Sequence, residues 1–183
     1  MTTINHLVAA KIKTATRVDI DKCYQCGKCT AGCVLAGDMD YPSSMLIRML
    51  QTDDEENYRK ILSSNAIWLC QNCENCIGRC PKEVDIPKVM DYLRAESVKA
   101  GYVSPKAKSI LSFYKSFLGA VKYSGRLSEV MMTIGFKMRT MRLWQDVMLA
   151  PSMLAKGKLK IIPDSIKDTK VIKNIFKSTK NDK

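Results

Sequence analysis

Apolar residues in this chain recur at intervals of three and four positions, which is the period of an α-helix and not the alternation of a β-strand. We therefore expect a mainly α protein. The strongest helical signal covers 86–98, with Pro87 in the first turn and Gly101 just past the end. Other helices are predicted to begin near Ser43 and behind the acidic run 53–56, and to cover 65–69, 104–119 and 126–149.

The two ends of the chain give weaker helical signals. Residues 1–18 scatter a few apolar side chains among lysines, which predicts a short arm that is partly extended near residues 14–18. From Pro151 onward the chain is rich in lysine and only weakly apolar. This composition predicts a second arm with one short helix at most, and a disordered end over 178–183.

All eight cysteines lie in two runs with the same spacing, C-x₂-C-x₂-C-x₃-C, which begin at Cys23 and Cys70. This is the spacing of bacterial ferredoxins, in which three cysteines of a run hold one 4Fe–4S cube and the fourth ligates the other cube. An all-helical ferredoxin module with two 4Fe–4S clusters therefore fits both the cysteines and the helical period. The predicted ligands are Cys23, Cys26, Cys29 and Cys80 for the first cluster, and Cys70, Cys73, Cys76 and Cys33 for the second.

Disulfides and structural zinc are the other uses that eight cysteines could have. Disulfides are rare in reduced compartments, and the start of the chain has no charged-then-apolar export signal. Zinc ligands usually come as two separated pairs, whereas here a triplet plus one cysteine occurs twice. Iron–sulfur clusters are therefore favoured. Glycine allows the backbone to pass close to a ligand, so Gly27, Gly32 and Gly78 suit loops that wrap around clusters. An apolar shell around the clusters is expected from Trp68, Leu69, Ile77 and Ile86.

The net charge of +12 is unevenly placed along the chain. Residues 1–97 carry a net charge of −1, and residues 98–183 carry +13. A basic half suits nucleic acid, an anionic membrane or an acidic protein partner, and we favour a docking face for a protein partner. The methionine-rich helix over 126–149 has three interpretations, which are packing on its own chain, docking on a partner and lying on a membrane surface. The predicted domains are an N-terminal arm over 1–18, an all-helical ferredoxin domain over 19–101, and a basic helical extension and docking tail over 102–183.

The chain shows no place where a substrate bond would be broken. It has no glycine-rich phosphate loop and no G-x-S-x-G motif, and its one histidine, His6, is expected to be an ordinary surface residue. No uninterrupted apolar stretch approaches the length of a membrane span. We therefore expect a cytoplasmic electron-transfer protein without a transmembrane segment.

Four segments together resemble the iron–sulfur C subunit of heterodisulfide reductase from methanogenic archaea: Cys23–Cys33, Tyr41–Leu50, Ile67–Cys70 and Cys80–Pro87. The resemblance is good over roughly residues 15–105 and loose over the basic tail. The cluster domain is also shared with iron–sulfur subunits of succinate dehydrogenase, glycolate oxidase and glycerol-3-phosphate dehydrogenase. The heterodisulfide reductase family is favoured because the chain lacks the plant-type ferredoxin domain of the first and the Cys-Cys-Gly domains of the other two.

The resemblance implies a relay role in methanogenesis. The C subunit takes electrons from the flavin-containing A subunit and passes them to the catalytic B subunit, which reduces the coenzyme M–coenzyme B heterodisulfide. The resemblance implies an oxidoreductase subunit without its own active site, in a complex to which a hydrogenase or formate dehydrogenase is often attached. The alternatives are an electron-transfer subunit of a succinate-, glycolate- or glycerol-3-phosphate-type dehydrogenase and a nucleic-acid-binding cluster protein, although no nucleic acid is expected as a partner.

Overall fold

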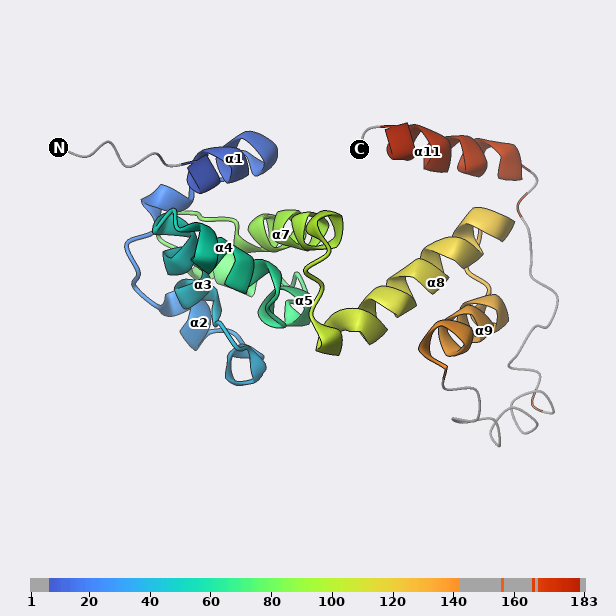
Figure 1. Ribbon diagram of the computed structural model, residues 1–183, viewed down its shortest axis with the longest axis horizontal. Helices are drawn as coiled ribbons and strands as arrows, with labels where there is room; N and C mark the ends of the chain where they lie inside the picture. Colours follow the sequence, from blue (N-terminus) through green and yellow to red (C-terminus); the bar gives the residue numbers. More distant parts are fainter. Residues whose placement is uncertain (1–6, 142–155, 157–165, 167, 182–183) are drawn as a thin grey trace. The chain divides into compact units, whose positions relative to one another are not determined.

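The structure is a computed structural model, and it describes residues 7–141, 156, 166 and 168–181. Every regular element within these residues is a helix, which confirms the predicted mainly α fold. The chain divides into two compact units, Met1–Ala107 and Lys108–Lys183, and each is described by itself. Figure 1 colours the first unit from blue to yellow-green and the second from yellow to red.

The first unit is a bundle of short helices joined by tight loops (Figure 1). The helices predicted near Ser43, behind the acidic run 53–56 and over 65–69 are confirmed as α3, α4 and α5. The α-helices are α1 (Leu7–Thr16), α2 (Lys28–Ala31), α3 (Ser43–Gln51), α4 (Glu55–Leu62), α5 (Ala66–Leu69), α6 (Asn75–Arg79) and α7 (Ile86–Ala100), and the 3₁₀ turns are η1 (Ile20–Lys22), η2 (Ala36–Asp38) and η3 (Pro105–Ala107).

The core of this unit forms where α1, α3, α4, α5 and α7 meet. Each helix turns an apolar face inward, and burying one large apolar side chain is worth about 1.5–3 kcal/mol. Helices α3 and α7 supply the largest share of this core. The large apolar side chains that are fully buried are Ile12, Ile20, Leu46, Ile47, Leu50, Ile61, Ile67, Val89, Met90 and Leu93.

Helix α7 confirms the predicted helix 86–98 and both of its end signals. The carboxylate of Asp85 caps the helix by accepting a hydrogen bond from the backbone N–H of Lys88 at 3.1 Å, and Pro87 lies in the first turn. Gly101 ends the helix at a φ of 76°, a left-handed conformation that glycine adopts at little cost. Because α7 begins shortly after the second cysteine run, these end signals also fix where the run is held.

The N-terminal segment is more helical than its sequence predicts. The sequence pattern predicts an arm extended near residues 14–18, but α1 continues to Thr16. The carboxylate of Asp53 accepts hydrogen bonds from the backbone N–H groups of Leu7 and Val8 at 2.9 and 2.7 Å, and so caps α1 from a distant part of the chain. The buried face of α1 packs on α3 and α7. Tertiary packing and this remote cap therefore override the weak local signal.

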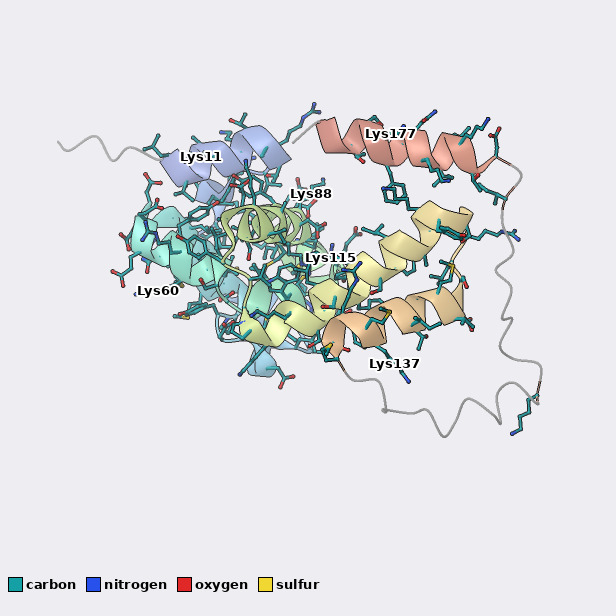
Figure 2. The ribbon with its side chains drawn as sticks, turned by 45° about the vertical axis from the view of Figure 1, so that its right-hand side comes forward. Lys11, Lys60, Lys88, Lys115, Lys137 and Lys177 are labelled. Carbon is teal, nitrogen blue, oxygen red and sulfur yellow. The ribbon has the colours of Figure 1, made fainter. Side chains whose placement is uncertain are left out.

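In the second unit, the described residues form three helices, with α11 packed along α8. Helices α8 and α9 make a hairpin whose turn contains Gly125 at a φ of 75°. Phe113 and Phe136 join the two helices edge-to-face, with ring centroids 6.2 Å apart. Lysines project from all three helices, including Lys115, Lys137 and Lys177 (Figure 2). The bounds are α8 (Lys108–Ser124), α9 (Glu129–Thr140) and α11 (Thr169–Asn181).

Several helix boundaries in this unit differ from the sequence prediction. Helix α8 continues past the predicted end to Ser124. Helix α9 covers only part of the predicted helix 126–149, whose last residues lie outside the described ones. Helix α11 reaches Asn181, so the predicted disorder over 178–183 is wrong for the described part of that segment. Its amphipathic pattern outweighs the low mean hydropathy on which the predicted disorder rests.

Among the helices of the described residues, none is both long enough and apolar enough to cross a bilayer. His6, predicted to be a surface residue, lies outside the described part of the chain.

Candidate cluster-binding site

The two cysteine loops have the same backbone shape although their sequences differ. Gln25 and Gly27 flank the second cysteine of the first loop and have φ values of 62° and 75°. Asn72 and Glu74 flank the second cysteine of the other loop and have φ values of 50° and 60°. Three of these four left-handed residues are not glycine, and such residues cost about 1–3 kcal/mol each and concentrate at ligand clamps. The shared shape therefore indicates a shared task, to present three sulfurs around one ligand.

A long polar side chain holds the start of the first loop. Gln51, at the end of α3, donates from Nε2 to the backbone carbonyls of Ile20 and Cys23, both at 2.9 Å. Its Oε1 accepts a hydrogen bond from Gln25 Nε2 at 3.3 Å. Gln25 Nε2 also lies 3.4 Å from Cys23 Sγ, within reach of an N–H···S hydrogen bond. The first cysteine is therefore anchored through both its carbonyl oxygen and its sulfur.

Arg94, near the middle of α7, holds the start of the second loop. Its Nε donates to the carbonyl of Ile67 at 2.5 Å, and its Nη2 donates to the carbonyl of Cys70. Its Nη1 donates to Asn72 Oδ1 at 3.3 Å and to Asp91 Oδ1 at 2.8 Å. Each anchor thus binds the first cysteine of its loop and the residue three positions earlier.

These contacts belong to an internal repeat. The second cysteine run follows the first by 47 positions, and α7 follows α3 by 43 positions when Arg94 is matched to Gln51. The matched helices share four buried positions, and the shorter connection in the second half lacks a counterpart of η2. The shared positions are Ser43, Leu46, Ile47 and Leu50 on α3, and Ile86, Val89, Met90 and Leu93 on α7, which also buries Pro87 and Ser97.

The short helices that follow the two loops, α2 and α6, lie side by side. Asn75 Nδ2 donates to the carbonyl of Gly32 at 3.2 Å. The Arg79 side chain covers Gly32 so closely that a Cβ there would lie 2.4 Å from it. Cys33 and Cys80 follow these two helices in the chain, so the packing of α2 on α6 brings the ends of the two cysteine runs together.

A cavity of about 90 Å³ lies beside the second loop. Part of its wall is apolar and comes from Leu35, Met39, Ile86 and Pro87. The cavity therefore offers both sulfur donors and the dry surroundings that influence the reduction potential of a cluster. The cysteines in its lining are those of the second predicted ligand set: Cys33, Cys70, Cys73 and Cys76.

Tyr24 lies in the first loop, and its pKa is raised by desolvation and then by the negative charges of Cys26, Cys80 and Cys23. Three thiols of the first predicted set thus act electrostatically on this tyrosine. The backbone N–H of Val84 lies 3.4 Å from Cys80 Sγ, a distance that allows it to donate to the sulfur. Such N–H···S bonds favour the charged thiolate that iron requires.

Desolvation acts on two of the cysteine thiols, Cys29 on α2 and Cys76 on α6. Burial raises the pKa of Cys29. Burial, followed by the negative charge of Cys70, raises the pKa of Cys76 to about 11. The thiolate is the metal ligand, so cluster assembly at these positions must release protons from neutral thiols.

The donors fit an iron–sulfur cluster better than a single metal ion. Among the described residues, no three or more histidines, cysteines or carboxylates lie close enough together to hold one ion. A zinc ion requires its sulfurs about 2.3 Å from a single point. A 4Fe–4S cube takes one cysteine per iron, so its four sulfur donors stay spread around the cube. The four thiols that line the cavity beside the second loop match the second arrangement.

Sequence reasoning misses several residues of this site. Gln51 and Arg94 are not among the predicted residues. The one signal in the sequence is that isoleucine stands three positions before the first cysteine of each run, at Ile20 and Ile67, and the carbonyls of these residues are the ones that the two anchors bind. Gln25, Asn72 and Glu74 carry left-handed backbone without any glycine signal. Of the predicted glycines, Gly27 has a positive φ and Gly32 a close neighbour, whereas Gly78 has neither. Of the predicted apolar shell, Ile86 lines the cavity, and Trp68, Leu69 and Ile77 do not.

Comparison with protein families gives a match over residues 19–84 to the 4Fe-4S dicluster domain. This segment contains both cysteine runs, both loops and Gln51, the anchor of the first loop. Together with the eight cysteines, the match supports 4Fe–4S clusters as the cofactor of this chain.

Several curated proteins that are similar to this chain are named as C subunits of heterodisulfide reductases. The C subunit of the "H(2):CoB-CoM heterodisulfide,ferredoxin reductase" of Methanothermobacter thermautotrophicus is 35% identical over 103 residues, 56% of this chain and 54% of the relative. An iron-sulfur C subunit of the "CoB--CoM heterodisulfide reductase" of Methanocaldococcus jannaschii is 30% identical over 118 residues, 63% of this chain and 60% of the relative. The corresponding iron-sulfur C subunit of Methanopyrus kandleri is 26% identical over 132 residues, 72% of this chain and 67% of the relative. The alignment spans about half the length of the first of these relatives, and the predicted resemblance to the C subunit is confirmed.

Proposed function

We propose that this chain is the electron-transfer subunit of a heterodisulfide reductase, with two 4Fe–4S clusters and no active site of its own. Single electrons enter from the flavin-containing A subunit and leave to the catalytic B subunit, which reduces the coenzyme M–coenzyme B heterodisulfide. The names of the relatives support the reductase, and the dicluster match supports the cofactor. We expect the complex in the cytoplasm, with a hydrogenase or formate dehydrogenase as a further partner.

One observation carries this proposal: Cys33 of the first run lines one cavity together with the three cysteines of the second loop. The electrostatic effect of Cys80 on Tyr24 of the first loop supports the reverse exchange. When bound, the clusters supply one-electron redox chemistry, and crossed ligation keeps them close together. The chain's own residues hold and insulate them, and this arrangement suits a relay.

The proposal is tested by purifying the chain without oxygen, together with its native partners. We expect about eight irons and eight acid-labile sulfides per chain, as for two cubes, and co-purification with the flavin-containing and catalytic subunits. The protein, once reduced, should be reoxidised by the catalytic subunit in the presence of the heterodisulfide. About four irons per chain at full occupancy would contradict two clusters. Co-purification with a flavin dehydrogenase and a quinone-binding anchor would instead support the dehydrogenase alternative.

The ligand sets are tested with single substitutions of the fourth cysteines. Cys33→Ser should weaken only the cluster of the second loop, and Cys80→Ser only that of the first, because a serine hydroxyl replaces one of four thiolates in each case. Iron content should fall from about eight toward about four in either variant. Loss of the same spectral signal in both variants would show that the fourth cysteines are not shared crosswise.

A further inference from the structure

We propose that Arg94 is a potential-setting residue, whose positive charge raises the reduction potential of the cluster in the Cys70 loop. Gln51, its counterpart in the repeat, leaves the cluster in the Cys23 loop without this effect. The inference rests on the proposed function, since it concerns how two bound clusters differ.

The two anchors bind equivalent backbone carbonyls but differ in charge. Gln51 binds the carbonyls of Ile20 and Cys23 with neutral N–H groups. Arg94 binds the equivalent carbonyls, including that of Cys70, with a guanidinium. A guanidinium is a cation and an amide is neutral, so the two anchors differ by one positive charge. The repeat therefore supplies an internal comparison, in which one loop has a cation at a position where the other has an amide.

The guanidinium is close to a predicted ligand and is shielded from water. It binds the carbonyl of Cys70, and its second partner, Asn72, has its Oδ1 3.6 Å from Cys70 Sγ. The Arg94 side chain is only 16% exposed. A charge in such surroundings is screened less than one at the surface. Each electron added makes a cluster more negative, so a nearby fixed cation stabilises the reduced state and raises the potential.

Two carboxylates near the second loop act in the opposite direction. Asp91 accepts from Arg94 Nη1 at 2.8 Å and from Asn72 Nδ2 at 2.9 Å, and Glu74 lines the cavity. Asp91 is 56% exposed, however, and Glu74 is also exposed, so water screens both. Arg94 is thus the least screened of the three charges. We infer that it offsets the two carboxylates, and that removing it lowers the potential of this cluster.

The test is an anaerobic redox titration of the full chain with its clusters, followed by electron paramagnetic resonance. Arg94→Gln copies the natural residue of the first half and should lower one of the two reduction waves by a shift equivalent to about tenfold, or 59 mV for one electron. Gln51→Arg should raise the other wave. Arg94→Lys keeps the charge and should retain most of the wild-type potential. Lys60→Gln removes a positive charge from the exposed Lys60–Glu56 pair on α4 and should move neither wave (Figure 2).

Asp91→Asn provides a second variant, at a position whose side chain is 56% exposed. It removes the negative partner of Arg94 and should raise the same wave that Arg94→Gln lowers. The inference is overturned if Arg94→Gln moves neither reduction wave. It is also overturned if Arg94→Lys lowers a wave as much as Arg94→Gln does, or if Asp91→Asn lowers that same wave. Fewer than two clusters in the wild-type protein would instead overturn the proposed function, and the inference with it.

Discussion

At the scale of single residues, backbone conformation rather than side-chain type shapes the two loops. Gly27 could be predicted, because glycine is the usual residue at a positive φ. Glu74 occupies the same place in the second loop at a φ of 60°, and no sequence rule identifies a glutamate there. Its conformation is imposed by the surrounding repeat, which holds both loops in one shape. The cysteine positions can therefore be read from the sequence, and the strain that orients them cannot.

Gly27→Ala should destabilise the protein, and Gly78→Ala should not. A Cβ at either glycine would meet no other atom within 4 Å, so the two sites differ mainly in backbone conformation. Gly27 has a φ of 75°, and an alanine there costs about 1–2 kcal/mol. Gly78 lies in α6, where alanine should gain about 0.5–1 kcal/mol. Denaturant midpoints of the two variants, measured without oxygen, check this prediction. Equal midpoints would show that the left-handed position does not matter.

At the scale of elements, helices whose end signals lie within their own sequence are predicted well. Helix α7 carries its cap, its proline and its terminal glycine in one continuous stretch, and the structure uses all three. Helix α1 depends instead on Asp53, 45 residues beyond Val8, for its N-terminal hydrogen bonds. The sequence pattern predicts that the whole acidic run 53–56 belongs to the start of α4. In the structure Asp54 caps α4, and the neighbouring Asp53 caps α1 instead. Remote caps of this kind cannot be read from local sequence, because they exist only after the chain has folded.

The packing of α4 on α7 predicts a loss of stability at alkaline pH. Burial, followed by the neighbouring Tyr92, raises the pKa of Tyr58 far above its usual value. In the unfolded chain Tyr58 ionises near pH 10. The unfolded state therefore loses its proton first, so stability is fully present below pH 10 and is lost as the pH rises above it. Tyr58→Phe should flatten this loss.

Thermal unfolding between pH 8 and pH 11 measures the effect. The unfolding midpoint of Tyr58→Phe should fall less than that of the wild-type protein over this interval. Tyr123→Phe, which removes a phenol that is 65% exposed, is the control and should follow the wild-type curve. If all three curves coincide, the α4–α7 contact does not hold Tyr58 in its neutral form.

At the scale of the whole molecule, the sequence separates an electron-carrying half from a basic half. All eight cysteines, both anchors and the fully buried large apolar side chains lie in the unit Met1–Ala107. Most of the positive charge lies beyond it, since residues 108–183 hold 16 lysines and arginines against five carboxylates, a net charge of +11. The helical class and the cysteine chemistry follow from spacing alone. The repeat, the anchors and the helix boundaries of the second unit depend on contacts between distant residues, so the sequence pattern does not reveal them.

This separation predicts that a chain ending at Ala107 keeps its clusters. No cysteine ligand and no anchor is removed, and the fully buried apolar residues of the first unit all remain. We expect about eight irons per truncated chain, with reduction waves close to those of the full chain. Co-purification with the flavin-containing and catalytic subunits should weaken, because the proposed docking tail is gone. A chain ending at Leu69 is the matched control, and it should hold no stable cluster, since each predicted ligand set needs both cysteine runs. Retention of one cluster by that shorter chain would mean that a single run is sufficient, and crossed ligation could not then be the reason why the two halves of the repeat stay together.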